Sequence, residues 1–562
     1  MVEAVAFLSQ SSPKRTKTPL GTILAVLDDL SAHPLVRRII YWAALIFFVV
    51  IVLIPPIAGV VLKLGLLTDT LHDPSLILRV QSAIAASFII AFLVSLLDLV
   101  AGIPTAWFIV RRKSRWASVV DTLADIPFVI PTVALGFSVL IFWSQPGGLS
   151  SLLRVERLVS PGVGLVMLLH FAFSYPIIVR LMVGELQGYD QVYETASRTL
   201  GASPLTAART VTLPIMKPAL VSAFLLAFCR SLSETGATAV VAGIFENGPL
   251  LIRNARAQGQ EGPMVLVSAV LIISSCLIFA VISLLGPRLR LPTKKVWPHA
   301  EKNLSSPKAS LAKDSVSLAI FGLFVAIPSL FVILPASAAF ADGTIVSALS
   351  GSGVWGAFWS SLVNSYVLGI SATLMNLTVG FPMAVMIARR RLGPRFTALL
   401  DALISVPITI PSVALGVSLG YFWAAFGNLP EFWVLILVHT TITYTYFVRT
   451  MSAAIESIPP ELEEVGRTLG GRPFETFRKI VLPLSKYSIF SGAVLVLTRS
   501  IDETGATVAV AKEIKTAPVL LVQWIQSPNQ YSQSTVSLGV LLLVLTAFVS
   551  LFAIRLALRR SH

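Results

Sequence analysis

The amino-acid sequence predicts an all-α, polytopic membrane protein with about 12 transmembrane helices in two homologous six-helix halves. Hydrophobic residues make up 55% of the 562 residues and charged residues 13%, whereas soluble proteins carry about 25% charged residues. Apolar runs of about 20 residues recur along the chain, and a helix of that length crosses the hydrocarbon core of a bilayer. Because these runs are continuous rather than alternating, we expect the spans to be helices and not strands of a barrel.

Six apolar runs are predicted to span the membrane in each half of the chain. Residues 1–38 precede the first run as a cytoplasmic N-terminal segment, and the polar residues 288–314 form a cytoplasmic linker. The first half is therefore residues 39–287 and the second half residues 315–562. The predicted spans are residues 39–63, 80–110, 118–143, 162–187, 217–243 and 264–287, followed by 315–338, 359–388, 398–426, 430–452, 486–511 and 535–557.

Basic residues flank the predicted spans instead of forming a nucleic-acid-binding surface, although the net charge is +15. Clusters stand at residues 111–113, 389–391 and 559–560. With the N-terminus in the cytoplasm, alternation of 12 spans places all three clusters on the cytoplasmic side, as the positive-inside rule requires. The sequence therefore predicts a multi-pass protein of a prokaryotic inner membrane with both termini cytoplasmic, whose surroundings are lipid and not nucleic acid.

Several motifs occur once in each half at matching places. Gly102-Ile-Pro-Thr-Ala106 corresponds to Gly380-Phe-Pro-Met-Ala384, and the glutamates Glu234 and Glu503 stand in corresponding Glu-Thr-Gly-Ala-Thr stretches. Each half has an even number of spans, so both halves enter the membrane in the same orientation. We expect them to be related by a pseudo-twofold axis along the membrane normal, with a pathway between two facing bundles.

A polar segment between the fourth and fifth predicted spans is also written twice. The first copy is Glu194-Thr-Ala-Ser-Arg-Thr-Leu-Gly201, continuing to Leu213-Pro214, and the second is Glu463-Glu-Val-Gly-Arg-Thr-Leu-Gly470, continuing to Leu482-Pro483. Glycine followed by proline predicts a turn between two short helices. The segment is either a surface element without a partner or a docking site, and its duplication favours docking.

These two segments resemble the coupling loops of ATP-binding-cassette importer permeases, in which an acidic residue precedes a glycine by six positions and a Leu-Pro pair ends the loop. Glu464 and Gly470 keep that spacing, whereas Thr195 takes the acidic position in the first copy and Glu194 lies one residue earlier. The chain is most similar to the fused, two-in-one permeases of type I importers, such as those for ferric iron, thiamine and molybdate or sulfate.

The resemblance implies a set of partners. Two copies of an ATPase subunit would bind the two coupling loops, and an extracytoplasmic solute-binding protein would deliver the solute. The residues implied at the ATPase contacts are Glu194, Thr195, Gly201, Pro214, Glu463, Glu464, Gly470 and Pro483. No Gly-x-x-x-x-Gly-Lys-Ser/Thr loop occurs in the sequence, so ATP and magnesium are expected on the partner and not on this chain. The chain is therefore predicted to be a permease subunit and not an enzyme.

Charged residues recur in the fifth predicted span of each half. Arg230 and Glu234 are four residues apart and share a helix face. A charge at mid-bilayer costs about 2.5–3.5 kcal/mol on insertion scales, so such residues face either a partner or a wet pathway. A structural ion pair and a pathway lining are both compatible with the pattern. The candidates are Arg230, Glu234, Thr235 and Gly236 in the first half and Arg499, Asp502, Glu503, Thr504 and Gly505 in the second.

Paired prolines are a further pathway candidate. Pro127 and Pro131 in the first half correspond to Pro407 and Pro411 in the second. Proline removes a backbone hydrogen bond and kinks a helix, so these kinks either form a gate or shape helix packing. His170 and His439 are expected to form hydrogen bonds with neighbouring helices, and no cluster predicts a catalytic or metal centre.

The predicted function is a permease subunit of a binding-protein-dependent importer, with ferric iron or a small oxyanion as the favoured solute. Thiamine, a polyamine or a phosphonate is also compatible with the motifs. The alternative function is a secondary active transporter of six-plus-six architecture, which needs no ATPase and no duplicated docking loop.

Overall fold

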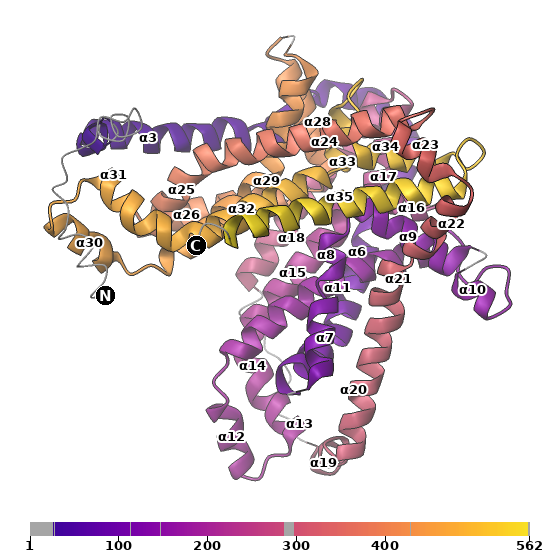
Figure 1. The fold of residues 1–562 in the computed structure, drawn as a ribbon, viewed down its shortest axis with the longest axis horizontal. Helices are drawn as coiled ribbons and strands as arrows, with labels where there is room; N and C mark the ends of the chain where they lie inside the picture. The colour runs from indigo at the N-terminus through magenta and orange to yellow at the C-terminus, as the bar shows by residue number, and fades with distance from the viewer. Residues whose placement is uncertain are drawn as a thin grey trace. The chain divides into compact units, whose positions relative to one another are not determined.

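The computed structural model describes residues 26–559, apart from 27, 113, 146–147, 286–296 and 428. Within these ranges the chain forms helices and no strand (Figure 1). Ten helices are long and apolar enough to cross a membrane, and two bent helix pairs raise the number to 12. The prediction of an all-α polytopic chain is therefore confirmed. The start of the predicted N-terminal segment and residues 288–296 of the predicted linker lie outside the described residues.

The helices that the structure describes mostly begin within a few residues of the predicted spans. Proline stands at the first or second position of many of them, where its missing N–H needs no partner. The main elements in the first half are α3 (Pro34–Phe47), η1 (Phe48–Leu53), α6 (Pro74–Arg111), α7 (Arg115–Leu123), α8 (Ile126–Val129), α9 (Thr132–Ser144), α11 (Val163–Gly188), α15 (Lys217–Ser233), α16 (Gly236–Val241), α17 (Gly248–Ala257) and α18 (Glu261–Leu285).

The second half repeats this order after the linker helix α19 (Pro298–Leu304), and α20 (Pro307–Phe321) leads from the linker into this half. The α20 helix begins the first span of this half. The further elements are η5 (Gly322–Ala326), α21 (Ile327–Leu330), α24 (Trp355–Met375), η6 (Asn376–Gly380), α25 (Phe381–Ala388), α26 (Pro394–Ile404), α27 (Val406–Thr409), α28 (Ser412–Ala424), α29 (Glu431–Glu456), α32 (Leu482–Ile501), α33 (Gly505–Val510), α34 (Ala517–Gln526) and α35 (Gln533–Arg559).

The described residues divide into two compact units that do not coincide with the two sequence halves. Unit 1 contains the residues up to Pro56 together with Tyr366–Pro407 and Ile436–Ser500. Unit 2 contains Ile57–Ser365, Ile408–Leu435 and the residues from Ile501 onward. Each unit therefore draws on both halves of the chain.

In unit 1 the first span of the first half packs among helices of the second half. Phe48 of η1 is fully buried and stacks on Tyr444 of α29, with ring centroids 5.8 Å apart. The Thr441 hydroxyl donates to the carbonyl of Ile51 over 3.1 Å. Ala44, Phe48 and Val52 share one core cluster with Met383 and with residues of α29. Burial of these apolar groups positions α3 and η1.

In unit 2 the first span of the second half packs on helices of the first half. The hydroxyls of Thr105 on α6 and Ser317 on α20 are 2.5 Å apart, and Ser138 donates to the carbonyl of Pro328 over 2.6 Å. Phe321 stacks on Tyr175 of α11, with centroids 6.1 Å apart. The first spans are thus exchanged between the halves in both units, which the sequence analysis did not predict.

Two kinds of predicted span are interrupted. At the paired prolines the predicted kink takes the form of a helix break, and the helices Pro394–Thr409 and Ser412–Ala424 are bent by 103° across it. Pro131 has an extended backbone with ψ of 139° and is the N-cap of α9, and Pro411 is the N-cap of α28 in the same way. The fifth span is also broken, since α15 ends at Ser233 and Glu234 is extended before α16 begins. The α32–α33 break after Ile501 repeats this interruption.

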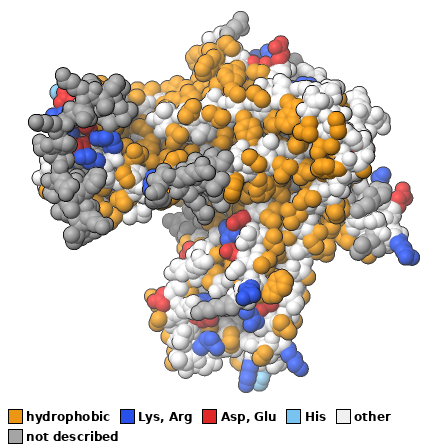
Figure 2. Space-filling view, viewed as in Figure 1, with side chains coloured by type: hydrophobic (Ala, Val, Ile, Leu, Met, Phe, Trp, Pro, Cys, Tyr) orange, Lys and Arg blue, Asp and Glu red, His pale blue; other side chains and the backbone are white. Residues whose placement is uncertain are grey.

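Charged and hydrophobic side chains are separated on the visible face of unit 2. Figure 2 shows charged side chains gathered at the end of this unit where Figure 1 places α12 (Val192–Thr199), α13 (Pro204–Ala207) and α19, with hydrophobic side chains over the helices beyond it. The repeated polar segment of the first half belongs to this charged end.

Candidate functional site

The repeated polar segments, called here the coupling segments (residues 188–216 and 453–485), fold as the sequence predicts. The first contains α12 (Val192–Thr199), α13 (Pro204–Ala207), η3 (Ala208–Thr212) and α14 (Leu213–Ile215). The chain then bends by 73° into α15. The second contains α30 (Pro460–Thr468), α31 (Pro473–Thr476) and η7 (Phe477–Val481), which leads into α32.

A glycine with positive φ ends the first short helix of each coupling segment. Gly201 has φ of 96° and Gly470 has φ of 87°. The N–H of Ala202 donates to the carbonyl of Ser197, and that of Gly471 donates to Gly466, over 3.1 and 3.0 Å. This pattern closes a helix C-terminus around a left-handed residue, where glycine has no steric penalty. Both glycines are therefore required by backbone geometry.

One glutamate of each coupling segment makes an ion pair within its own unit. Glu194 lies 2.9 Å from Arg111 at the end of α6, and Glu463 lies 2.8 Å from Arg389 at the end of α25. The two pairs occupy corresponding places in the repeat. Thr195 and Glu464, which the loop signature had aligned, are exposed in both copies. The matched carboxylates are therefore Glu194 and Glu463, and the two segments are more alike than the signature suggested.

Exposed apolar side chains project from the same short helices. Leu200 is 89% exposed and Leu469 is 56% exposed, each directly before the positive-φ glycine. Tyr193 and Val192 on α12 are also mostly exposed. Leucines this exposed at two corresponding positions mark a surface suited to a protein partner.

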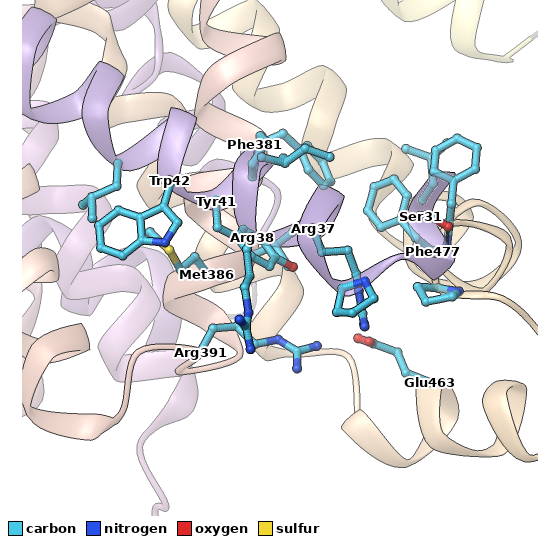
Figure 3. A pocket seen from close by; sticks show the side chains of 18 of the residues that line it. Ser31, Arg37, Arg38, Tyr41, Trp42, Phe381, Met386, Arg391, Glu463 and Phe477 are labelled. Carbon is cyan, nitrogen blue, oxygen red and sulfur yellow. Dashed lines mark hydrogen bonds between the residues drawn. The ribbon is translucent and has the colours of Figure 1, made fainter. Parts of the chain in front are cut away.

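A cavity of about 940 Å³ lies beside the second coupling segment in unit 1. It is lined by residues of α3, α25 and both short helices of the segment (Figure 3). Arg38, Arg391 and Glu463 bring charge to a cavity whose remaining walls are largely apolar, with Trp42 and Phe381 among them. The second coupling segment is thus held close to the start of α3.

The two broken fifth spans meet in unit 2. A Cβ on Gly236 would lie 2.7 Å from Cβ of Thr504, and one on Gly505 would lie 2.9 Å from the Thr235 hydroxyl. Contacts this close leave no room for a Cβ at either glycine unless the facing threonine shifts. We call the two Thr-Gly pairs, Thr235–Gly236 and Thr504–Gly505, the glycine junction. The four residues are buried.

The glutamates that occur in both copies of the repeat, Glu234 and Glu503, hold the short helices that begin at the glycine junction. Glu234 accepts a hydrogen bond from the Ala237 N–H, and Glu503 accepts one from the Ala506 N–H, both over 3.0 Å. The other Glu234 oxygen lies 2.9 Å from Arg230, as the four-residue spacing predicts. These carboxylates therefore satisfy free N–H groups at helix starts. Arg499 lies near the end of α32.

Helices α9 and α28 begin at the same place and are capped across the repeat. Asp502 accepts from the N–H of Thr132 over 2.6 Å, and the Ser233 hydroxyl accepts from the N–H of Ser412 over 3.2 Å. Ser233 and Asp502 correspond in the repeat. Pro131 and Pro411 position these starts, so the two prolines and the junction form one structural site. Pro127 is buried in the short helix α8, and Pro407 lies within α27.

Buried histidines of the fourth predicted spans make corresponding hydrogen-bond contacts in the two halves. His170 lies 2.7 Å from the Ser231 hydroxyl and 2.9 Å from that of Thr238, and His439 lies 2.7 Å from Ser500. The predicted role of both histidines in helix contacts is confirmed. Ser174 donates to the buried carboxylate of Asp98, a contact that the sequence analysis missed.

No group of three or more His, Cys, Asp or Glu side chains suited to a metal ion occurs in the described part of the chain. The two cysteines form no disulfide, since Cys229 and Cys276 are free thiols. The residues at the glycine junction instead offer hydroxyl groups and backbone N–H groups.

Known transport proteins resemble both halves of this chain. The family described as the binding-protein-dependent transport system inner membrane component matches residues 98–291 and 380–562. The sulfate transport system permease protein CysT of Salmonella typhimurium is 30% identical over 205 residues, which are 35% of this chain and 72% of that protein. The molybdate/tungstate transport system permease protein WtpB of Thermococcus kodakarensis is 30% identical over 215 residues, which are 38% of this chain and 81% of that protein. The family sequence is thus present twice.

Proposed function

This chain belongs to the binding-protein-dependent transport system inner membrane components, and we propose that it is a fused importer permease driven by separate ATPase subunits, with a small oxyanion as solute. The duplicated coupling segment is the observation that carries this proposal. Two copies with matched positive-φ glycines and exposed leucines, Leu200 and Leu469, suit two copies of one partner. The ATP and magnesium then belong to that partner.

The coupling segments face the cytoplasm in this proposal. Basic residues at 111–112 and 389–391 end the second spans beside these segments, and the positive-inside rule places such clusters on the cytoplasmic side. Both chain termini are then cytoplasmic. An extracytoplasmic solute-binding protein delivers the solute to the opposite face.

The glycine junction is the closed point of the proposed pathway. A cavity of about 810 Å³ in unit 2 is lined by Phe137 and Leu140 of α9 and by Ala239 and Val240 of α16. The buried start of α16 at Gly236 stands three residues before Ala239 on the same helix. Closure at the junction follows from the approach of each glycine to the threonine of the other pair and needs no large side chain. Separation of the two Thr-Gly pairs opens the pathway when ATP binding brings the coupling segments together.

An oxyanion is the solute that the observations favour. The matching permeases are named for sulfate and for molybdate or tungstate. The Thr235 hydroxyl is buried at the glycine junction, and a hydroxyl can donate to an oxyanion, whereas the first N–H groups of α9 and α28 already donate to Asp502 and Ser233. Ferric iron, by contrast, is held by carboxylate, histidine or phenolate groups.

Uptake by cells lacking their own sulfate and molybdate permeases tests the solute class. Cells expressing this chain with its ATPase and binding protein are expected to accumulate labelled sulfate or molybdate. Excess unlabelled oxyanion is expected to suppress that uptake, whereas ferric citrate is expected to leave it unchanged. Accumulation of labelled iron without accumulation of either oxyanion would overturn the assignment.

A further inference from the structure

Two acidic residues outside the coupling segments bind the coupling segments at corresponding places. Glu301 of the linker helix α19 lies 2.6 Å from Arg209 in the first coupling segment. Asp28, before the first span, lies 3.9 Å from Arg478 in the second. Arg209 and Arg478 correspond in the repeat, because they are 269 residues apart, the same separation as between Gly201 and Gly470. Each contact lies within one unit.

A serine adds a second matched contact at each place. The Ser305 hydroxyl accepts from the N–H of Leu205 over 3.0 Å, and the Ser31 hydroxyl accepts from the N–H of Phe474 over 3.1 Å. Leu205 and Phe474 are also 269 residues apart. Each serine in turn donates to the carbonyl of its own acidic residue, Glu301 or Asp28. Figure 3 shows Ser31 beside Phe477 at the edge of the cavity in unit 1.

Burial and charge indicate that these contacts are specific features of the fold and not chance surface contacts. Glu301 is 3% exposed and Asp28 is 2% exposed, and carboxylates are almost never so buried without a partner. Hydrogen bonding from Thr206, reinforced by the Arg209 guanidinium, holds the pKa of Glu301 below its ordinary value. Trp297 packs 5.1 Å from that guanidinium. The carboxylate therefore remains charged and bound at neutral pH.

The positions of Glu301 and Asp28 in the sequence show which spans these contacts hold. Glu301 stands six residues before Pro307, which begins α20, and Asp28 stands six residues before Pro34, which begins α3. These helices are the exchanged first spans, since α20 packs on first-half helices and α3 on second-half helices. Each coupling segment is thus fastened to the first span that belongs to the other half of the sequence.

We propose that Glu301–Arg209 and Asp28–Arg478 are clasps that make each exchanged first span move with the coupling segment of the opposite half. The proposal rests on the proposed function, because an ATPase must move the coupling segments. Each first span continues directly into its own half, so a clasped span transmits the displacement of one bundle to the other. The four residues are positioning residues, and the clasps make the two bundles open together.

Simultaneous measurement of uptake and ATP hydrolysis in proteoliposomes tests the clasps. The chain and its ATPase are reconstituted with the binding protein, and labelled sulfate is the probe. Glu301→Gln and Asp28→Asn are each expected to lower sulfate uptake per ATP at least about fivefold, the scale of a typical coupling between sites. Glu246→Gln is the matched control, because Glu246 pairs with Arg79 at 2.7 Å within unit 2 and lies outside both coupling segments. The control is expected to match the natural chain.

The outcomes separate this inference from the proposed function. If the natural chain shows no ATP-dependent uptake of any oxyanion, the proposed function and the clasps are both contradicted. If the natural chain works and the clasp variants keep its uptake per ATP, the clasps alone are overturned. Restoration of coupling by the exchange Glu301→Arg with Arg209→Glu would show that the ion pair, and not only the packing, is required.

A cross-link tests the same inference without removing the ion pair. The hydroxyls of Ser203 and Ser305 are 3.3 Å apart, so Ser203→Cys with Ser305→Cys is expected to form a disulfide that holds the first clasp closed. If the span and the segment move together, the oxidised variant transports sulfate at the rate of its reduced form. Loss of uptake on oxidation, recovered by dithiothreitol and absent from the single-cysteine variants, would show that the clasp opens during transport and would overturn the proposal.

Discussion

Gly416 of α28 lies against the backbone of Ala506 on α33, so closely that a Cβ would fall 2.6 Å from the Ala506 Cα. The corresponding pair in the first half is looser, since a Cβ on Gly136 would lie 3.0 Å from the Cα of Ala237. These contacts pack α28 against α33 and α9 against α16, the short helices that begin at the glycine junction. The junction is therefore held by backbone approach on both sides of the repeat.

Replacing Gly416 with alanine is expected to destabilise the protein by about 1–3 kcal/mol, because overpacking forces backbone to move. The looser pair predicts a smaller loss for Gly136→Ala. Gly184→Ala in α11 is the control, since its Cβ would meet nothing within 4 Å. Thermal unfolding in detergent measures all three, and equal stability of the Gly416 and Gly184 variants would contradict the described packing.

Valine at Gly201 or Gly470 is expected to disturb the coupling segments through backbone strain alone. A Cβ at either glycine meets no atom within 4 Å, yet φ is 96° or 87°, and such strain costs about 1–3 kcal/mol. We expect weaker co-purification of the ATPase with unchanged membrane insertion. Gly184→Ala again serves as the control. Undiminished ATPase binding by the double valine variant would count against the docking assignment.

Asparagine at Asp98 is expected to preserve folding and transport. Asp98 contacts Ser174 on α11, and the corresponding residue of the second half, Asn376, donates to the Thr443 hydroxyl over 2.8 Å. The repeat therefore already uses an amide at this place. Removing a buried carboxylate also removes its desolvation cost. Asp98→Leu is expected to lower the thermal stability, and a loss of transport in Asp98→Asn would reveal a need for the charge.

Glutamine at Glu234 or Glu503 is expected to lower stability while leaving transport largely intact. The side chain would still accept from the N–H of Ala237 or Ala506, but the charge-assisted part of the bond, about 1.5–3 kcal/mol for a charged partner, would weaken. Uptake rate and melting temperature are measured on the same preparation. A slower uptake without a fall in melting temperature would instead assign these glutamates to the solute pathway.

The sequence predicted those features that depend on local pattern. Apolar run length located the spans, and the spacing of Arg230 and Glu234 predicted their ion pair. Repeated glycines predicted the turns of the coupling segments. The breaks at Pro131 and Glu234 were not predicted. The residues on both sides of each break are as apolar as those of a continuous helix, so hydropathy does not distinguish the two.

Long-range partners were the other features that the sequence analysis missed. Glu301 lies in a polar linker, where a carboxylate is usually solvated. Its burial beside Arg209 therefore could not be predicted from the sequence. The pairing of Glu194 with Arg111 requires the end of α6 to lie beside α12. Comparison of the two halves offered one usable signal, since Asp28 and Glu301 stand at equal distances before the prolines that begin their spans.

Uptake of labelled oxyanion by proteoliposomes, with and without the ATPase subunit, tests the central claim most directly. The purified chain is reconstituted with its binding protein outside and ATP on the ATPase side. We predict uptake only when the ATPase and hydrolysable ATP are both present, with none from an ion gradient alone. Uptake by the chain without any ATPase would contradict the account and would identify a secondary transporter of six-plus-six architecture.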